Sequence, residues 1–114
     1  MPKPEAATLL RVFVGEQDRH GGLPLYEAIV LRAREAGLAG ATVIRAVMGY
    51  GHSSRVHTAK ILRLSNDLPF IVEIVDSEER IQAFLPQLDA MIGSGLVTLE
   101  PATVIRYGER RPSP

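Results

Sequence analysis

Two stretches decide the fold, Gly40–Gly51 (GATVIRAVMGYG) and Pro69–Asp76 (PFIVEIVD). Both are rich in β-branched residues that alternate with other side chains, which is typical of strands that bury one face. Between them, residues 52–63 (HSSRVHTAKILR) contain three basic residues, two histidines and no acidic residue. A segment of this composition does not suit a core. We therefore predict two strands joined by a projecting basic loop, and loops on a rigid sheet commonly carry binding function.

The composition limits the class of protein. A chain of 114 residues fits one domain, and a domain of that size buries roughly two thirds of the surface that its unfolded chain exposes. Thirteen acidic and thirteen basic residues give a net charge of zero. The surface as a whole therefore lacks the strong net charge that would attract nucleic acid or a membrane. Because the chain has no cysteine, disulfides, thiolate nucleophiles and cysteine metal sites are excluded.

The ends of the chain are polar and contain proline. We expect one domain over residues 1–114, with residues 1–6 and 109–114 flexible. The start lacks the apolar run of a signal peptide, and no stretch approaches the roughly 18 apolar residues of a membrane span. We therefore expect a cytoplasmic protein.

The remaining elements follow from periodicity and from turn residues. The expected elements, in chain order, are a strand at 7–14, a helix at 23–36, strands at 40–51 and 70–75, a helix that starts after Asp76, a strand at 96–100 and an extended piece at 103–107. Asp76 followed by Glu79 predicts a capping box. Pro86 predicts a kink in the second helix, Gly93–Gly95 is expected to end that helix, and Pro101 predicts an edge strand or a bulge.

The resulting element order is βαββαβ. With right-handed crossovers this order predicts an α+β, ferredoxin-like sandwich. Its antiparallel sheet has the spatial order 4-1-3-2, with strands numbered along the chain, and both helices cover one face.

The alternation within the strands assigns residues to the two faces. We expect even-numbered residues such as Leu10, Ile44 and Val72 to face the helices in the first three strands. The opposite, open face then has large apolar residues around one charge per strand. Across the sheet these charges read Glu100, Arg11, Glu73 and Arg45. Their signs alternate, which favours cross-strand pairing. A solvated sheet face is the alternative, but so apolar a surface favours burial in a homo-oligomer.

Several of these stretches resemble PII signalling proteins. Gly40–Gly51 is similar to their second strand, which ends in Gly-aromatic-Gly at the base of a long T-loop. Residues 71–75 (IVEIV) resemble their third strand, and 104–110 (VIRYGER) resemble their C-terminal Arg-x-Gly-Glu-Arg segment. A more specific resemblance is to the PII-like branch known only as a domain of unknown function. The stretches that carry it are 15–18 (GEQD), 24–29 (PLYEAI), 37–42 (GLAGAT), 60–65 (KILRLS) and 67–69 (DLP).

The resemblance implies a trimer whose sheets face inward. It also implies effector binding in clefts between subunits, and PII proteins use such a cleft for adenine nucleotides. Carried over by position, the ligand-binding residues are Gly49, Gly51 and His52 at the loop base, Gly93, Ser94 and Gly95 in the turn after the second helix, and Arg106, Gly108 and Arg110 in the C-terminal segment. Arg55 and Lys60 of the loop supply further positive charge for an anionic effector.

Two departures from the PII pattern affect this interpretation. The turn at 93–95 is shorter than the PII turn and lacks its basic residue. The loop is also shorter than a T-loop, and Tyr50 lies at its base rather than at its tip. Regulation by tyrosine modification therefore does not carry over.

Other functions are less well supported by the residues. No nucleophile and base form a recognised motif, so we do not expect an enzyme, and no cofactor is required. RNA binding on the open face would need aromatic residues, and that face offers only Phe13, so no nucleic-acid partner is expected. No metal signature is present, although His20, His52 or His57 near carboxylates could bind a divalent cation.

The sequence therefore predicts a PII-like, homotrimeric sensor. A small anionic effector, with an adenine nucleotide as the first candidate, would bind between subunits, and the loop at 49–63 would regulate a partner protein. Two alternatives remain open. One is a metal-responsive trimer of the same fold, and the other is a ligand-free adaptor whose loop docks on a membrane transporter.

Overall fold

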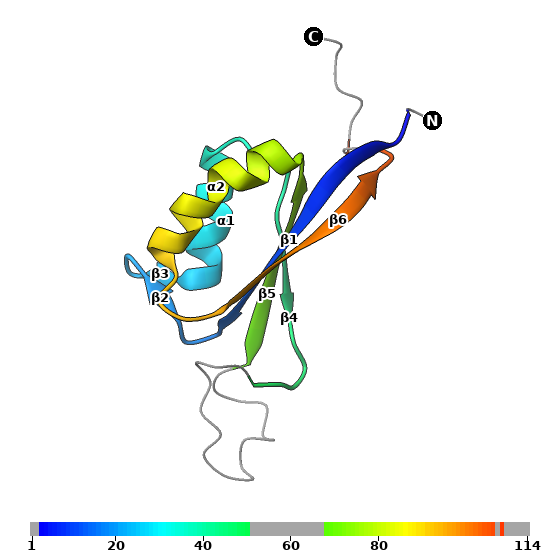
Figure 1. The fold of residues 1–114 in the computed structure, drawn as a ribbon. Coiled ribbons are helices and arrows are strands. Elements are labelled where there is room, and N and C mark those ends of the chain that lie inside the picture. Colours follow the sequence, from blue (N-terminus) through cyan, green and yellow to red (C-terminus); the bar gives the residue numbers. More distant parts are fainter. Residues whose placement is uncertain (1–2, 51–67, 107, 109–114) are drawn as a thin grey trace.

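One antiparallel sheet organises the chain. The computed structural model describes residues 3–50, 68–106 and 108. Its elements in chain order are β1 (Glu5–Gly15), β2 (Arg19–His20), β3 (Leu23–Pro24), α1 (Leu25–Glu35), β4 (Thr42–Arg45), β5 (Pro69–Asp76), α2 (Glu78–Met91) and β6 (Leu96–Val104). The main sheet has the order β4-β5-β1-β6, which is the predicted order 4-1-3-2, and both helices lie on one side of it (Figure 1). The predicted ferredoxin-like architecture is confirmed.

The core lies between the helices and the even-numbered residues of β1 and β5. Leu10, Val12, Val72 and Ile74 are at most 1% exposed and pack against apolar residues of both helices, including Phe84. Burying one such aliphatic side chain contributes about 1.5–3 kcal/mol. The alternation in these two strands therefore sets which side of the sheet the helices cover.

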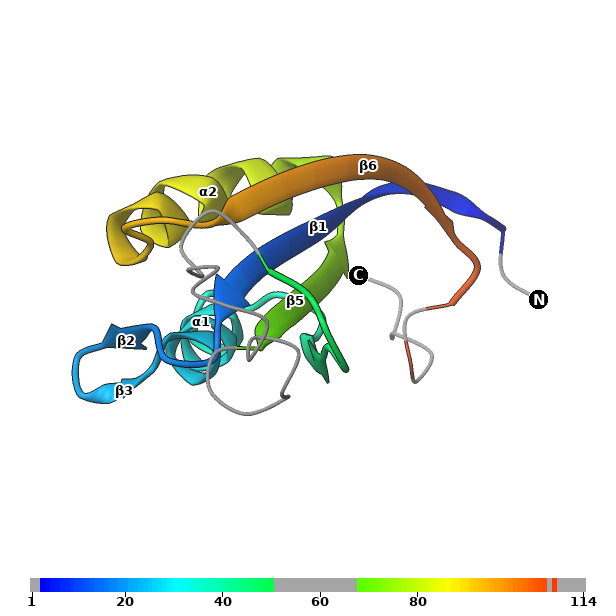
Figure 2. The same cartoon turned by 90° about the horizontal axis from the view of Figure 1, so that it is seen from below.

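The central strand β1 is longer than predicted. It pairs with β5 from Thr8 to Gly15 and with β6 from Glu5 to Phe13. Glu5 and Ala6 belong to this strand, so the expected flexible lead-in through residue 6 is wrong for them. Beyond the helices, β1 and β6 continue as a two-stranded ribbon (Figure 2).

Strand β6 is one continuous edge strand. It runs through Pro101, which lies opposite Thr8, so the predicted division into two extended pieces is wrong. The predicted edge position is confirmed, because β6 pairs with β1 alone within the described sheet. An edge strand tolerates proline because its outer side needs no N–H donor. Pro86 lies inside α2, which continues to Met91. The kink there stays a prediction.

Both helix starts differ from the expected ones. A short β2–β3 hairpin precedes α1, which begins at Leu25 with Pro24 as its N-cap. The capping box predicted at Asp76 and Glu79 is wrong, because Ser77 caps α2 and its Oγ accepts a hydrogen bond from the Arg80 N–H at 3.2 Å. Asp76 is instead a buried carboxylate that bonds to two backbone amides.

The parity of β4 is opposite to the predicted one. Val43 lies opposite Val72 and packs against the core, whereas Ile44 lies opposite Ile71 and is 42% exposed. Both Val43 and Ile44 are apolar, so the alternation alone did not distinguish the faces. A shift of one residue moves every side chain of a strand to the other face.

We predict that Gly95→Ala destabilises the protein. A Cβ at Gly95 would lie 2.9 Å from the carbonyl oxygen of Phe13, a backbone atom that cannot move aside without distorting β1. We expect a loss of about 1–3 kcal/mol in the free energy of unfolding, as for other overpacked sites. Urea denaturation measures this loss. The matched control is Gly93→Ala, where a Cβ meets nothing within 4 Å, and equal destabilisation by both changes would contradict the packing argument.

Candidate ligand-binding site

Three of the four predicted charges form a linked group on the open face. Arg11 lies opposite Glu73 in the strand register, and its Nε donates a hydrogen bond to Glu73 at 2.9 Å. Its Nη1 donates a second one to Glu100 at 2.7 Å. The hydrogen bond to Glu73, together with the negative charges of Glu100 and Glu73, raises the pKa of Arg11 above its ordinary value. We call Glu100, Arg11 and Glu73 the charged triad.

Arg45 does not belong to this group, so the predicted four-residue row is wrong. Its partner in the register is Phe70, whose side chain is buried on the helix side of the sheet. The β4 residue opposite Glu73 is Thr42. The reason is the shifted parity of β4. Arg45 instead pairs with Glu16, whose carboxylate oxygens lie 3.4 and 3.5 Å from Nη2.

Around the charged triad the open face is apolar. Leu9 lies opposite Val75 and Phe13 opposite Ile71, and all four side chains are only partly buried. Leu96 extends the apolar surface and is 56% exposed. The predicted character of this face is confirmed for β1 and β5.

The predicted ligand-binding residues that the structure describes lie at opposite ends of the sheet. Gly49 and Gly93–Gly95 lie where β1 ends, since a Cβ on Gly49 would contact Pro69 and one on Gly95 would contact Phe13. Arg106 and Gly108 follow Val104, which pairs with Glu5 at the start of β1. A single protomer therefore does not bring the two groups together.

Five of the predicted binding residues fall outside the described part of the chain. They are Gly51, His52, Arg55, Lys60 and Arg110. His57 falls outside it as well, whereas His20 is a partly buried residue of β2. Among residues 3–50, 68–106 and 108, no group of three or more His, Asp or Glu side chains could hold a metal ion. Within the same residues, neither helix is long and apolar enough to cross a membrane.

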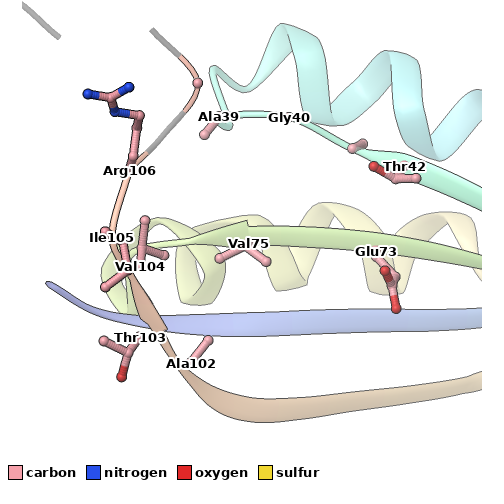
Figure 3. A pocket seen from close by; sticks show the side chains of 12 residues that line it. Ala39, Gly40, Thr42, Glu73, Val75, Ala102, Thr103, Val104, Ile105 and Arg106 are labelled. Atoms are coloured by element: carbon pink, nitrogen blue, oxygen red, sulfur yellow. The ribbon is translucent and has the colours of Figure 1, made fainter. Parts of the chain in front are cut away.

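Arg106 and Gly108 line a groove of about 990 Å³ on the open face (Figure 3). Its walls are the α1–β4 connection and the end of β6, and Val75 and Glu73 of β5 lie between them. The full lining is Ala39, Gly40, Ala41, Thr42, Glu73, Val75, Ala102, Thr103, Val104, Ile105, Arg106 and Gly108. Most of these side chains are small or apolar, and Arg106 and Glu73 are the charged ones.

The residues of the α1–β4 wall were not predicted from the sequence, because they have no reactive side chains. The wall is held by Asp76, whose Oδ2 accepts a hydrogen bond from the Ala39 N–H at 2.8 Å while its Oδ1 accepts one from Ser77 at 2.7 Å. Arg80 also donates to the carbonyl oxygen of Gly37 at 2.9 Å. The signal available in the sequence was Asp76 itself, an acidic residue after a buried strand that was interpreted as a helix cap.

The base of the basic loop is tied to the sheet from both sides. The Ala46 N–H donates to the carbonyl oxygen of Pro69 at 2.9 Å, and the Glu16 N–H donates to that of Leu68 at 3.0 Å. The side chain of Glu16 also meets Arg45 here. We call Glu16, Arg45, Gly49 and Pro69 the loop stem.

The sheet order and the placement of both helices define a ferredoxin-like fold. Comparison with known proteins shows the family of the chain and supports this fold. The DUF190 family, described as "Uncharacterized ACR, COG1993", matches residues 7–104. The chain belongs to this family. The predicted resemblance to a family known only as a domain of unknown function is therefore confirmed.

Curated relatives match over most of their length. A UPF0166 protein of Aquifex aeolicus strain VF5 is 43% identical over 97 residues, which is 85% of this chain and 91% of the relative. A UPF0166 protein of Methanocaldococcus jannaschii is 36% identical over 101 residues, 88% of this chain and 93% of the relative.

Solved structures of PII-like proteins share the fold. CPII from Thiomonas intermedia K12, bound to ADP and bicarbonate, superposes with a TM-score of 0.57 at 20% identity and covers 93% of this chain and 95% of its own. A candidate PII-like signalling protein from Thermus thermophilus gives 0.63 at 18% identity, covering 92% and 94%. At this level of identity, the likeness shows the fold.

We predict that Asp76→Ala destabilises the groove wall and the fold. The change leaves two backbone N–H groups without their acceptor at a site that is 2% exposed. Each unsatisfied buried donor costs about 1–3 kcal/mol, so we expect a loss of about 2–4 kcal/mol in unfolding free energy. Urea denaturation measures it, and hydrogen exchange should accelerate at the Ala39 amide. Asp89→Ala, at an exposed position of α2, is the control, and a loss of the same size there would refute the specific role of Asp76.

Proposed function

We propose that the protein is a PII-like signal-transduction protein that acts as a homotrimer. It senses a small anionic effector, an adenine nucleotide, in clefts between subunits, and it regulates a partner protein through the loop at 49–63. The proposal assigns no catalytic residue to the chain. The observation that carries it is the position of the predicted ligand-binding residues at opposite ends of one sheet. Two such half-sites form one site only where two copies meet.

The open face supports self-association. It combines partly buried apolar side chains with the charged triad, in which the guanidinium of Arg11 already bonds to both carboxylates. Charges that are paired within one protomer can be covered by another copy at a lower desolvation cost than unpaired ones. Large exposed apolar patches commonly mark interaction sites. Three sheets packed face inward would cover this surface.

The groove places Arg106 and Gly108 on the same open face, next to the proposed interface. Arg106 would supply charge to the effector, and the glycine at 108, with a φ of 53°, adopts a backbone conformation that other residues rarely reach. Across the interface, Gly49 and Gly93–Gly95 of another copy would approach the ligand through their backbones. Gly51, His52, Arg55, Lys60 and Arg110 complete the proposed site.

The nucleotide is proposed from the structural neighbours. CPII structures contain ADP with bicarbonate, and ADP with AMP and acetate. Backbone N–H groups and arginines suit such anions. Binding that favours one arrangement of the loop would change which partner protein can dock. A membrane transporter is one candidate for the regulated partner.

We predict that the protein binds at least one adenine nucleotide. Isothermal titration of the purified oligomer with ATP, ADP and AMP measures affinity and stoichiometry, and we expect one nucleotide per cleft. Arg106→Gln should weaken binding roughly tenfold, because it removes a charge-assisted contact. Heat release with divalent cations alone would favour the metal-responsive alternative. Pull-down of a partner to the same extent with and without nucleotide would favour the ligand-free adaptor.

We also predict that Arg11→Ala breaks the trimer. Without the guanidinium, Glu73 and Glu100 remain on the open face as two like charges, and among the described residues the structure shows no other ion pair to either of them. Sedimentation at micromolar concentration should show the wild type at three times the 12.4 kDa chain mass and the variant at the mass of one chain. Arg34→Ala, at an exposed position of α1, is the control and should remain trimeric. A monomeric wild type would end the proposal.

A further inference from the structure

The end of the sheet that carries the loop stem holds several glycines but few cations. Gly49, Gly93 and Gly95 lie at this end. In the described part of the chain, two cationic residues belong to this end, Arg19 in β2 and Arg45 in β4. Arg19 donates to the carbonyl oxygen of Gly22 in its own hairpin. Arg45 is therefore the cation of this end that pairs with a side chain, that of Glu16.

The position of Arg45 follows from the strand register and not from its own side chain. It ends β4 opposite Phe70, and the next residue, Ala46, donates its N–H to Pro69. Pro69 is also the residue that a Cβ on Gly49 would contact, at 3.3 Å. Glu16 reaches the same place through its N–H bond to Leu68. Arg45, Glu16 and Gly49 thus each have their own link to residues 68–70.

The pair between Arg45 and Glu16 is loose. A single nitrogen, Nη2, lies 3.4 and 3.5 Å from the two carboxylate oxygens, longer than the 2.7–2.9 Å of a good charge-assisted bond. The side chain of Arg45 is 54% exposed and that of Glu16 is 28% exposed. Exposed ion pairs contribute little to stability. An anion that offered better geometry could therefore take the place of the Glu16 carboxylate at low cost.

We propose that Arg45 is an anion-binding residue of the loop stem and that Glu16 is its internal competitor. The ligand group is a carboxylate or phosphate, the chemistry that the Glu16 carboxylate imitates in the free protein. This inference deepens the proposed function and rests on it for the identity of the whole ligand. It gives a binding role to Arg45, which the alternation within the strands had placed among the charges of the open face.

If Glu16 competes with the ligand for Arg45, the affinity of the protein for an anion should change in a specific way in variants of the two residues. Arg45→Gln removes the binding group, so affinity falls roughly tenfold or more. Glu16→Gln removes the competitor, so affinity rises by about two- to fivefold. In the Arg45→Gln background, Glu16→Gln has no further effect, because the two residues act through one contact. Arg45→Lys keeps the charge without the planar fork and restores part of the affinity.

Two probes test the inference separately from the proposed function. ADP is titrated by calorimetry, and sodium phosphate is titrated by NMR at constant ionic strength, with the Arg45 Nε–H and the Gly49 amide as reporters. Arg34→Gln is the charge-matched control and should bind both probes as the wild type does. Thermal unfolding of each variant shows that it is folded.

The outcomes are distinguishable. Phosphate binding that depends on Arg45, with no ADP binding by the wild type, would support the inference and refute the nucleotide proposal. ADP binding that is equal in the wild type and in Arg45→Gln would overturn the inference and leave the nucleotide proposal standing. An effect of Glu16→Gln that persists without Arg45 would also overturn it, as would the absence of phosphate binding to the wild type.

Discussion

The charged triad at the centre of the sheet is the interaction on which the proposed assembly depends. Arg11 lies on β1, the strand that pairs with both β5 and β6, and it holds one carboxylate on each side. The triad therefore links three strands across the open face. Within the triad, Arg11 also neutralises part of the negative charge on a surface that is otherwise apolar. Another copy of the chain could therefore cover this surface without burying an unpaired charge.

The same central strand separates two places where a ligand could bind. At its start lies the groove next to Arg106, with a wall fixed by the buried carboxylate of Asp76. At its end lies the loop stem, where Arg45 meets Glu16. A strand of 11 residues spans about 35 Å at the usual rise per residue, so one small molecule cannot contact both ends in one protomer. In the proposed assembly, the two ends would meet between copies of the chain.

The faces of a strand were predictable from the sequence where apolar and polar residues alternate strictly, and not where two neighbouring residues are both apolar. In β1 and β5, the apolar residues on the helix side and the charges on the open side follow one strict period, and the structure has them as predicted. In β4, Val43 and Ile44 are both apolar, and the wrong one was assigned to the core. The role of Asp76 was also missed, because helix capping and backbone bonding use the same residue type.

The sequence by itself determined the element order, the strand order and the pairing of Arg11 with Glu73 and Glu100, because these follow from periodicity and from the handedness of crossovers. Tertiary structure alone decided that Arg45 meets Glu16, that Asp76 supports the α1–β4 wall and that the predicted half-sites lie apart. The contact of Asp76 with Ala39 depends on how the α1–β4 connection packs on the end of β5, and the contact of Arg45 with Glu16 depends on the register of β4 against β5. The alternation in β4 did not reveal that register, because Val43 and Ile44 are both apolar.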